Sequence, residues 1–85
     1  MDNMVCEYAA LHGQLDVLKW AHEVGLEWNA WTCAYAAYGG HLHVLRWLRE
    51  KGCPWDKHTV SFANMRGRAG IVAWAREHGC RCVAL

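Results

Sequence analysis

Long apolar runs are missing from this sequence. Its apolar stretches are far shorter than the roughly 18 residues that a membrane-spanning helix needs. The start of the chain also lacks a basic segment followed by an apolar one, which argues against a secretory leader. Five cysteines without such a leader fit free thiols in a reducing compartment. We therefore expect an intracellular, cytoplasmic protein that does not enter a membrane.

A large excess of one charge is also missing. Nine Lys and Arg residues balance eight Asp and Glu residues, which leaves a net charge of +1. This balance argues against wholesale attraction to nucleic acid or to membranes. The chain also has no glycine-rich phosphate loop and no paired carboxylates that recur on one face. We expect a protein that is not an enzyme and carries no cofactor.

The cysteines do not form a convincing metal site. His78, Cys80 and Cys82 supply three potential zinc ligands, whereas a structural zinc site normally has four. Most of the cysteines have another explanation, because Cys6 aligns with Cys33 and Cys53 aligns with Cys80 one repeat later. We expect no bound metal.

The dominant positive feature is an internal repeat of 27 residues without insertions. The residues that recur at this step are Trp20, Trp47 and Trp74, then Gly13, Gly40 and Gly67, then Gly25, Gly52 and Gly79. A fixed step of this length is the signature of a repeat architecture. We divide the chain into units 2–28, 29–55 and 56–82 with a tail 83–85, and we expect 1–85 to form a single domain.

Each unit is predicted to form two helices. Asp2, Asn29 and Asp56 occupy one repeat position and are favoured N-cap residues. A short first helix follows, and its small side chains recur at the spacing of one helical face. In the three units this face consists of Cys6, Ala9, Ala10 and Gly13, of Cys33, Ala36, Ala37 and Gly40, and of Val60, Ala63, Asn64 and Gly67. The second helix of the middle unit is predicted from about His41 to Lys51, with Gly52 ending it.

The segment YGGHLHVLRWLREKG of the middle unit resembles the ankyrin repeat. The step is 27 residues, not the usual 33, and the missing residues fall where that family has a β-hairpin finger. This short form is similar to arrays in giant viruses of amoebae and in some protists. A viral protein acts inside the infected cell, so the expected cytoplasmic location includes the cytoplasm of a host cell. The resemblance implies an all-α solenoid of three stacked helix pairs, with the fingers reduced to short loops.

The same resemblance implies a function. The first helices of ankyrin repeats line a concave face that binds other proteins, so we expect a non-catalytic interaction module. Arrays of the short form often accompany an F-box, and an alternative is a spacer or remnant of a longer array in an adaptor of a ubiquitin ligase.

Positions that vary among the three units point to the binding surface, because the repeat core does not dictate them. Trp31 is the strongest candidate, since its counterparts are Met4 and His58. Interfaces are enriched in Trp, Tyr, Met and Arg. The predicted strip consists of Trp31, Tyr38, Leu11, Met65, His58 and Arg66; ordinary solvated surface, with Trp31 packed on Trp55 or Tyr38, is the alternative.

Other surface positions and the tryptophans lead to further expectations. Glu7, Ala34 and Ser61 share a position that we also place on the rim of the first helices. The three tryptophans at positions 20, 47 and 74 should form a row of core or near-core side chains along the second helices. Trp28 and Trp55 should fold back over the helix ends and replace part of the burial lost with the hairpin.

Charge is unevenly distributed along the array. The three units carry −4, +2 and +3, so the first unit is acidic and the last is basic. This gradient suggests end-to-end self-association of copies. It also leaves a less favoured alternative, which is nucleic-acid binding through Lys57, Arg66, Arg68, Arg76 and Arg81.

Overall fold

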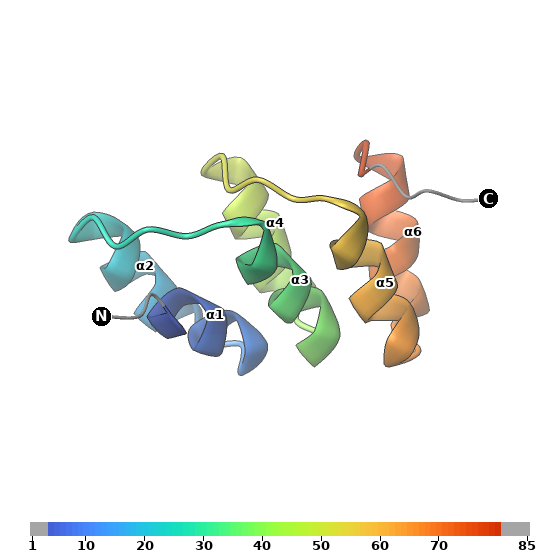
Figure 1. Ribbon diagram of the computed structural model, residues 1–85, viewed down its shortest axis with the longest axis horizontal. Coiled ribbons are helices and arrows are strands. Elements are labelled where there is room, and N and C mark those ends of the chain that lie inside the picture. Colours follow the sequence, from blue (N-terminus) through green and yellow to red (C-terminus); the bar gives the residue numbers. More distant parts are fainter. Residues whose placement is uncertain (1–3, 81–85) are drawn as a thin grey trace.

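A computed structural model describes residues 4–80. In this range the chain forms helices, turns and loops, without a strand. The six helices are α1 (Met4–Leu11), α2 (Leu15–Glu23), α3 (Ala30–Gly39), α4 (Leu42–Glu50), α5 (Lys57–Met65) and α6 (Ala69–Glu77). Successive helix pairs lie side by side along the long axis of the molecule (Figure 1), and the extents are 38 × 22 × 19 Å.

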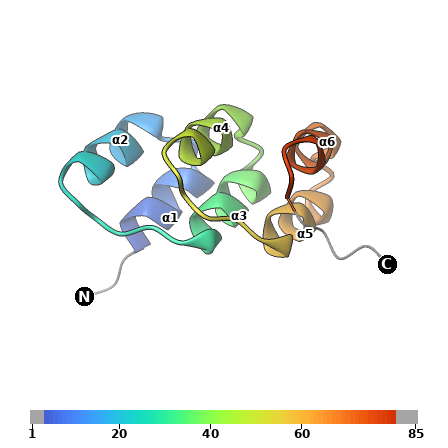
Figure 2. The same cartoon turned by 90° about the horizontal axis from the view of Figure 1, so that it is seen from above.

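The helices form two layers. Seen from above, α1, α3 and α5 make one layer and α2, α4 and α6 make the other (Figure 2). The segments 24–29 and 51–56 that link the pairs contain turns and loop residues only. This arrangement confirms the predicted all-α solenoid, with short loops in place of the β-hairpin fingers.

Side-chain caps start the first helices of the second and third units. The Asn29 carboxamide oxygen accepts a hydrogen bond from the Trp31 amide at 2.9 Å, and the Asp56 carboxylate does the same for the His58 amide at 2.9 Å. Each bond satisfies a backbone donor that the helix leaves unpaired. The third predicted cap, Asp2, lies outside the described residues.

Glycines end the helices, as predicted. Gly40 has a φ of 81° and caps α3 in the left-handed conformation, which a residue with a side chain adopts only at a cost. The five other glycines at the two repeated positions, which are Gly13, Gly25, Gly52, Gly67 and Gly79, have φ values between 67° and 88°. The 27-residue glycine spacing therefore reflects one backbone requirement that recurs in every unit.

The core lies between the layers and between successive pairs. Ala36 and Ala37 of α3 are fully buried, as are Leu45 and Leu48 of α4. Small side chains on the first helices let neighbouring helices approach closely, while the larger aliphatic residues of the second helices supply most of the apolar area. The predicted small face of the first helices is thus confirmed for the first two units.

Two predictions about the first helices fail at positions where the units differ. Ala34 is fully buried and does not lie on the rim, whereas Ser61 at the same repeat position is exposed. Asn64 is exposed, although its counterpart Ala37 is fully buried. The reason is the same in both cases: a following helix pair covers the second unit, and none covers the third within residues 4–80.

The predicted row of tryptophans is only partly buried. Trp47 and Trp74 are half-buried and pack against the core, but Trp20 is 54% exposed. The loop residues Trp28 and Trp55 meet Trp47 and Trp74 edge to face, each with ring centroids 5.7 Å apart. Each loop tryptophan therefore covers the next unit as well as its own helix end. The prediction of near-core packing is wrong for Trp20, because no helix pair precedes its unit within residues 4–80.

Candidate protein-binding surface

An aromatic cluster lies on the outer face of the first-helix layer. Trp31, Tyr35 and Tyr38 follow one face of α3 at i, i+4 and i+7, and all three contact the ring of Phe62 on α5. The distances from the Phe62 centroid to these three rings are 5.6, 5.8 and 5.8 Å. These are normal separations for tilted and edge-to-face aromatic pairs. The cluster therefore connects the second unit to the third across the surface.

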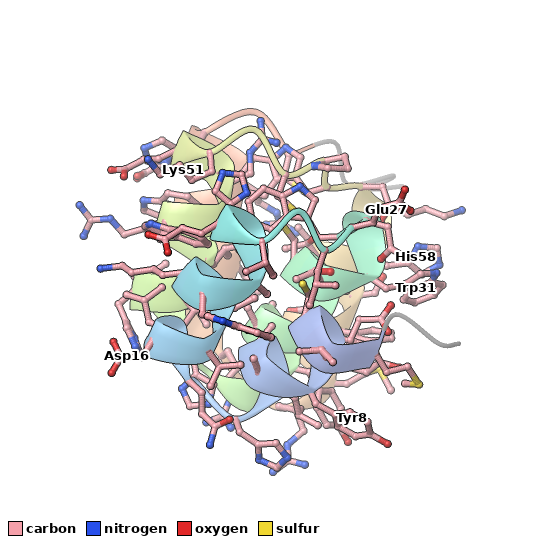
Figure 3. The ribbon with its side chains drawn as sticks, turned by 90° about the vertical axis from the view of Figure 1, so that its left-hand side faces the viewer. Tyr8, Asp16, Glu27, Trp31, Lys51 and His58 are labelled. Atoms are coloured by element: carbon pink, nitrogen blue, oxygen red, sulfur yellow. The ribbon has the colours of Figure 1, made fainter. Side chains whose placement is uncertain are left out.

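His58 and Trp31 form one end of this cluster and point outward together (Figure 3). Their ring centroids are 4.6 Å apart, and the planes are inclined by 40°. His58 Nδ1 lies 3.2 Å from the Asp56 carboxylate, which also caps α5. Trp31 remains 42% exposed in this setting. The pair thus presents a broad apolar surface with a polar edge.

A cation lies at the other end of the cluster. The guanidinium carbon of Arg66 is 5.0 Å from the centroid of the Tyr38 ring, and its Nη1 donates a hydrogen bond to the Tyr38 hydroxyl at 3.4 Å. A guanidinium over a tyrosine face is a cation–π contact. It holds the arginine against the surface and leaves its remaining donors available to a carboxylate.

A hollow of about 220 Å³ opens one repeat earlier on the same face. It is lined by Met4, Glu7, Tyr8, Leu11 and Tyr35. Met4 and Leu11 occupy the repeat positions of Trp31 and Tyr38, and Tyr35 occupies the position of Phe62. Smaller side chains therefore leave a space between α1 and α3 where aromatic rings fill the corresponding space between α3 and α5.

The structure brings four of the six predicted strip residues together in two pairs, Trp31 with His58 and Tyr38 with Arg66. Leu11 belongs to the neighbouring hollow, and Met65 is 69% exposed in the last turn of α5. The ring contacts of Trp31 are with His58 and Phe62, so the expected alternatives of packing on Trp55 or Tyr38 are wrong.

Two surface residues escaped the sequence analysis. Phe62 is the centre of the cluster, and Tyr8 is 56% exposed beside the hollow. Both share their repeat position with Tyr35, and the criterion of variation among the units does not select a position that is aromatic in all three. The spacing from Trp31 to Tyr35 to Tyr38 was the available signal, because it places all three rings on one side of α3.

Another hollow, of about 350 Å³, lies on the second-helix layer between α4 and α6. Its lining consists of Arg46, Arg49, Glu50, Trp74 and His78. Arg49 is already engaged there, because its Nη1 donates to the Cys53 carbonyl at 2.6 Å and its guanidinium lies 4.4 Å from the Trp55 ring centroid. The first-helix face, with its apolar hollow and exposed aromatic rings, is the better candidate for a protein partner.

Two cysteine thiols, on the first helices of units one and two, have a raised pKa. Burial raises the pKa of the Cys6 thiol. A hydrogen bond to Cys53 at 3.6 Å, together with burial, raises the pKa of Cys33. The thiol is far less nucleophilic than the thiolate, so neither residue is set up as a catalytic nucleophile. Within residues 4–80 no three His, Cys, Asp or Glu side chains are grouped so that they could hold a metal ion, and Cys82 lies outside this range.

The basic residues of the third unit do not share one surface. Arg66 lies on Tyr38 in the first-helix layer, whereas Arg76 belongs to α6 in the second layer. Arg68 packs on the preceding turn, since a Cβ atom added at Gly40 would lie 2.7 Å from its guanidinium carbon. Arg81 lies outside the described residues.

Within residues 4–80, no helix has the length and apolar character that crossing a bilayer requires.

Comparison with known proteins adds one finding. A family model described as ankyrin repeats in many copies matches residues 6–49, a range that includes most of α1, all of α2 and α3, and all but the last residue of α4. Searches of curated proteins and of solved structures returned no match. The match covers the two units in which the small face of the first helix is complete.

Proposed function

The chain belongs to the ankyrin-repeat family, whose repeats generally bind other proteins, and we propose that it does so through the outer face of its first-helix layer. The binding strip contains Trp31, Tyr38, Leu11, Met65, His58 and Arg66. The observation that carries the proposal is the aromatic cluster with Arg66 at its edge. Exposed Trp, Tyr and Arg side chains that are held in place are typical of binding hot spots.

The mechanism is presentation of a prearranged surface without chemistry. The Trp31 amide is bonded to the Asn29 cap, and its ring is supported by His58 and Phe62. A partner that docks on these rings loses little additional side-chain freedom, so more of the contact energy appears as affinity. We treat residues 1–85 as one domain in this role.

The hollow beside the cluster suggests how a partner is oriented. An apolar side chain of the partner enters the space between Leu11 and Tyr35, where Glu7 attracts a neighbouring cation. Arg66, at the opposite end of the strip, attracts a carboxylate. A partner segment with a basic residue at one end and an acidic residue at the other therefore fits the strip in one direction.

The test compares two double variants as baits for quantitative pull-down from a eukaryotic cell lysate. Trp31→Ala with Tyr38→Ala removes the centre of the strip. Val24→Ala with Arg46→Ala is the matched control, because both of these residues are exposed and lie on the side of the second helices. Partners captured by the wild type and the control should be lost from the strip variant.

Equal recovery by the strip variant and the wild type would end this proposal. Binding that survives the strip variant and falls steeply as salt is raised would indicate nucleic acid instead.

A further inference from the structure

Within residues 4–80, the end of the array formed by α1 and α2 has exposed apolar side chains. Val5, Tyr8 and Trp20 lie on this end and are 42%, 56% and 54% exposed. Figure 3 looks directly at it, with α1 and α2 in front and Tyr8 at the lower edge. A terminal repeat that faces only water is expected to be polar there.

Internal comparison shows what is missing at this end. Thr32 and Thr59, the counterparts of Val5, are both fully buried. The counterparts of Tyr8 and Trp20 are half-buried in both later units; they are Tyr35, Phe62, Trp47 and Trp74. In units two and three these positions are covered by the preceding helix pair. The first unit thus exposes a stacking surface that the chain elsewhere buries.

We propose that this surface binds the third unit of a second copy of the chain, so that copies stack head to tail in the register of the internal repeat. Inside the chain, Tyr38 meets Phe62 of the next unit with centroids 5.8 Å apart, and His22 meets Trp47 with centroids 5.8 Å apart. The first contact joins units two and three, and the second joins units one and two; at the later junction Arg49, the counterpart of His22, lines one hollow with Trp74. We take both as the pairs of repeat positions that face each other across a junction.

The same positions identify the residues that meet between copies. The counterpart of Tyr38 in the third unit is Met65, which faces Tyr8 of the next copy. The counterpart of His22 is Arg76, which faces Trp20. Met65 is 69% exposed, and Arg76 is exposed on α6. A methionine sulfur beside an aromatic ring and a guanidinium over a tryptophan are both favourable contacts.

Charge selects this orientation over a symmetric one. In the first unit Lys19 opposes Asp2, Glu7, Asp16, Glu23 and Glu27, which is +1 against −5 and gives −4. In the third unit Lys57, Arg66, Arg68, Arg76 and Arg81 oppose Asp56 and Glu77, which is +5 against −2 and gives +3. Pairing two first units would bring like charges together, whereas head-to-tail stacking brings opposite charges together.

The association is reversible. Ser61 and Asn64 replace Ala34 and Ala37, which are buried where the second unit meets the third, so the junction between copies contains more polar groups. A head-to-tail contact does not close on two molecules, and it therefore adds copies in a line. The expected behaviour is a mean mass that rises continuously from the 9.7 kDa monomer with concentration.

Sedimentation velocity of the full chain tests this from about 10 µM to about 1 mM, the range in which weak contacts of this size dissociate. Trp20→Ala disables the head and Arg76→Glu disables the tail. Each variant alone should associate about tenfold more weakly than the wild type. An equimolar mixture should restore association at wild-type strength, mainly as dimers, because each pair joins one intact head to one intact tail.

Arg46→Glu is the matched control, since it reverses an exposed arginine of the middle unit and should associate as the wild type does. Circular dichroism establishes that each variant is folded. A wild type that stays monomeric throughout overturns the proposal. So does an Arg76→Glu chain that associates normally by itself, which would mean a symmetric contact. Neither variant alters the binding strip, so these results do not affect the pull-down test of the proposed function.

Discussion

His41 Nε2 lies 3.0 Å from the carbonyl oxygen of Leu11, thirty residues earlier in the chain. A carbonyl can only accept, so Nε2 donates this hydrogen bond and the imidazole pairs a carbonyl at the end of α1 that the helix itself leaves free. The ring also packs against the turn of the preceding unit, where a Cβ added at Gly13 would lie 2.6 Å from Nδ1. The side chain of His41 therefore joins two units.

Replacing His41 should destabilise the stack. His41→Ala removes the bond to Leu11 and the ring that packs on Gly13, and we expect a loss of about 1–2 kcal/mol in the free energy of unfolding. His43→Ala, at an exposed position two residues later, should change stability by less than about 0.5 kcal/mol. Urea titration of both variants measures the difference, and equal stabilities would contradict the joining role.

Alanine substitutions at Gly13 and Gly67 distinguish the cost of backbone strain from the cost of crowding by a neighbouring side chain. Both end a first helix with a positive φ, 71° and 67°, so alanine at either position is strained by about 1 kcal/mol. Only Gly13 faces the His41 ring; around Gly67 no described atom lies within 4 Å of an added Cβ. Gly13→Ala should therefore lower the midpoint of thermal unfolding clearly more than Gly67→Ala. Equal shifts would show that the His41 ring moves aside freely.

The helices were predictable because their signals recur in every unit. Asn29 and Asp56 cap helices for a local reason, and a glycine such as Gly40 ends one for a local reason. Local causes act in the same way in each copy. For this reason the predicted second helix, His41 to Lys51, matches the observed helix, whose caps are these two residues.

Burial was less predictable, because it depends on neighbours that a repeat position does not specify. Trp20 has the same repeat position as Trp47, yet Trp47 packs edge to face on the loop residue Trp28, whereas Trp20 is more than half exposed. The binding strip shows the same limit. Variation among copies pointed to Trp31 and Tyr38, but the shared ring that joins them, Phe62, belongs to a position that looked like packing.

Thr32 and Thr59 provide a prediction in which the same substitution has two outcomes. Both are fully buried at the same repeat position. Thr32 Oγ1 accepts a hydrogen bond from the Asn29 amide at 3.3 Å and completes a capping box, whereas Thr59 Oγ1 has no partner among the described residues. Thr32→Val should cost about 1 kcal/mol, and Thr59→Val should be neutral or stabilise by up to about 1 kcal/mol.

Chemical denaturation of the two valine variants checks this, since valine keeps the shape of threonine. The sign of the Thr59 result is decisive. A loss of stability comparable to that of Thr32→Val would mean that the Thr59 hydroxyl has a bonding role in solution.

Because of Cys33, the free energy of unfolding should decrease with pH in the alkaline range. Its thiol donates to Cys53 at 3.6 Å, and Cys53 in turn donates to the Asn29 carbonyl at 3.4 Å. The bond to Cys53 and burial raise the pKa of Cys33 above its ordinary value of 9.0. The unfolded chain therefore loses this proton first as pH increases. The stabilisation is complete below about pH 9 and is lost above it, by about 1.4 kcal/mol for each further pH unit.

Cys33→Ala should reduce this dependence. At neutral pH the variant should be less stable than the wild type, because a buried side chain has been shortened. Above about pH 9 its stability should fall less steeply, so the two curves converge. Urea titrations over this range in the presence of a reductant measure both slopes. Curves that stay parallel would show that the Cys33 thiol ionises as readily in the folded chain as in the unfolded one.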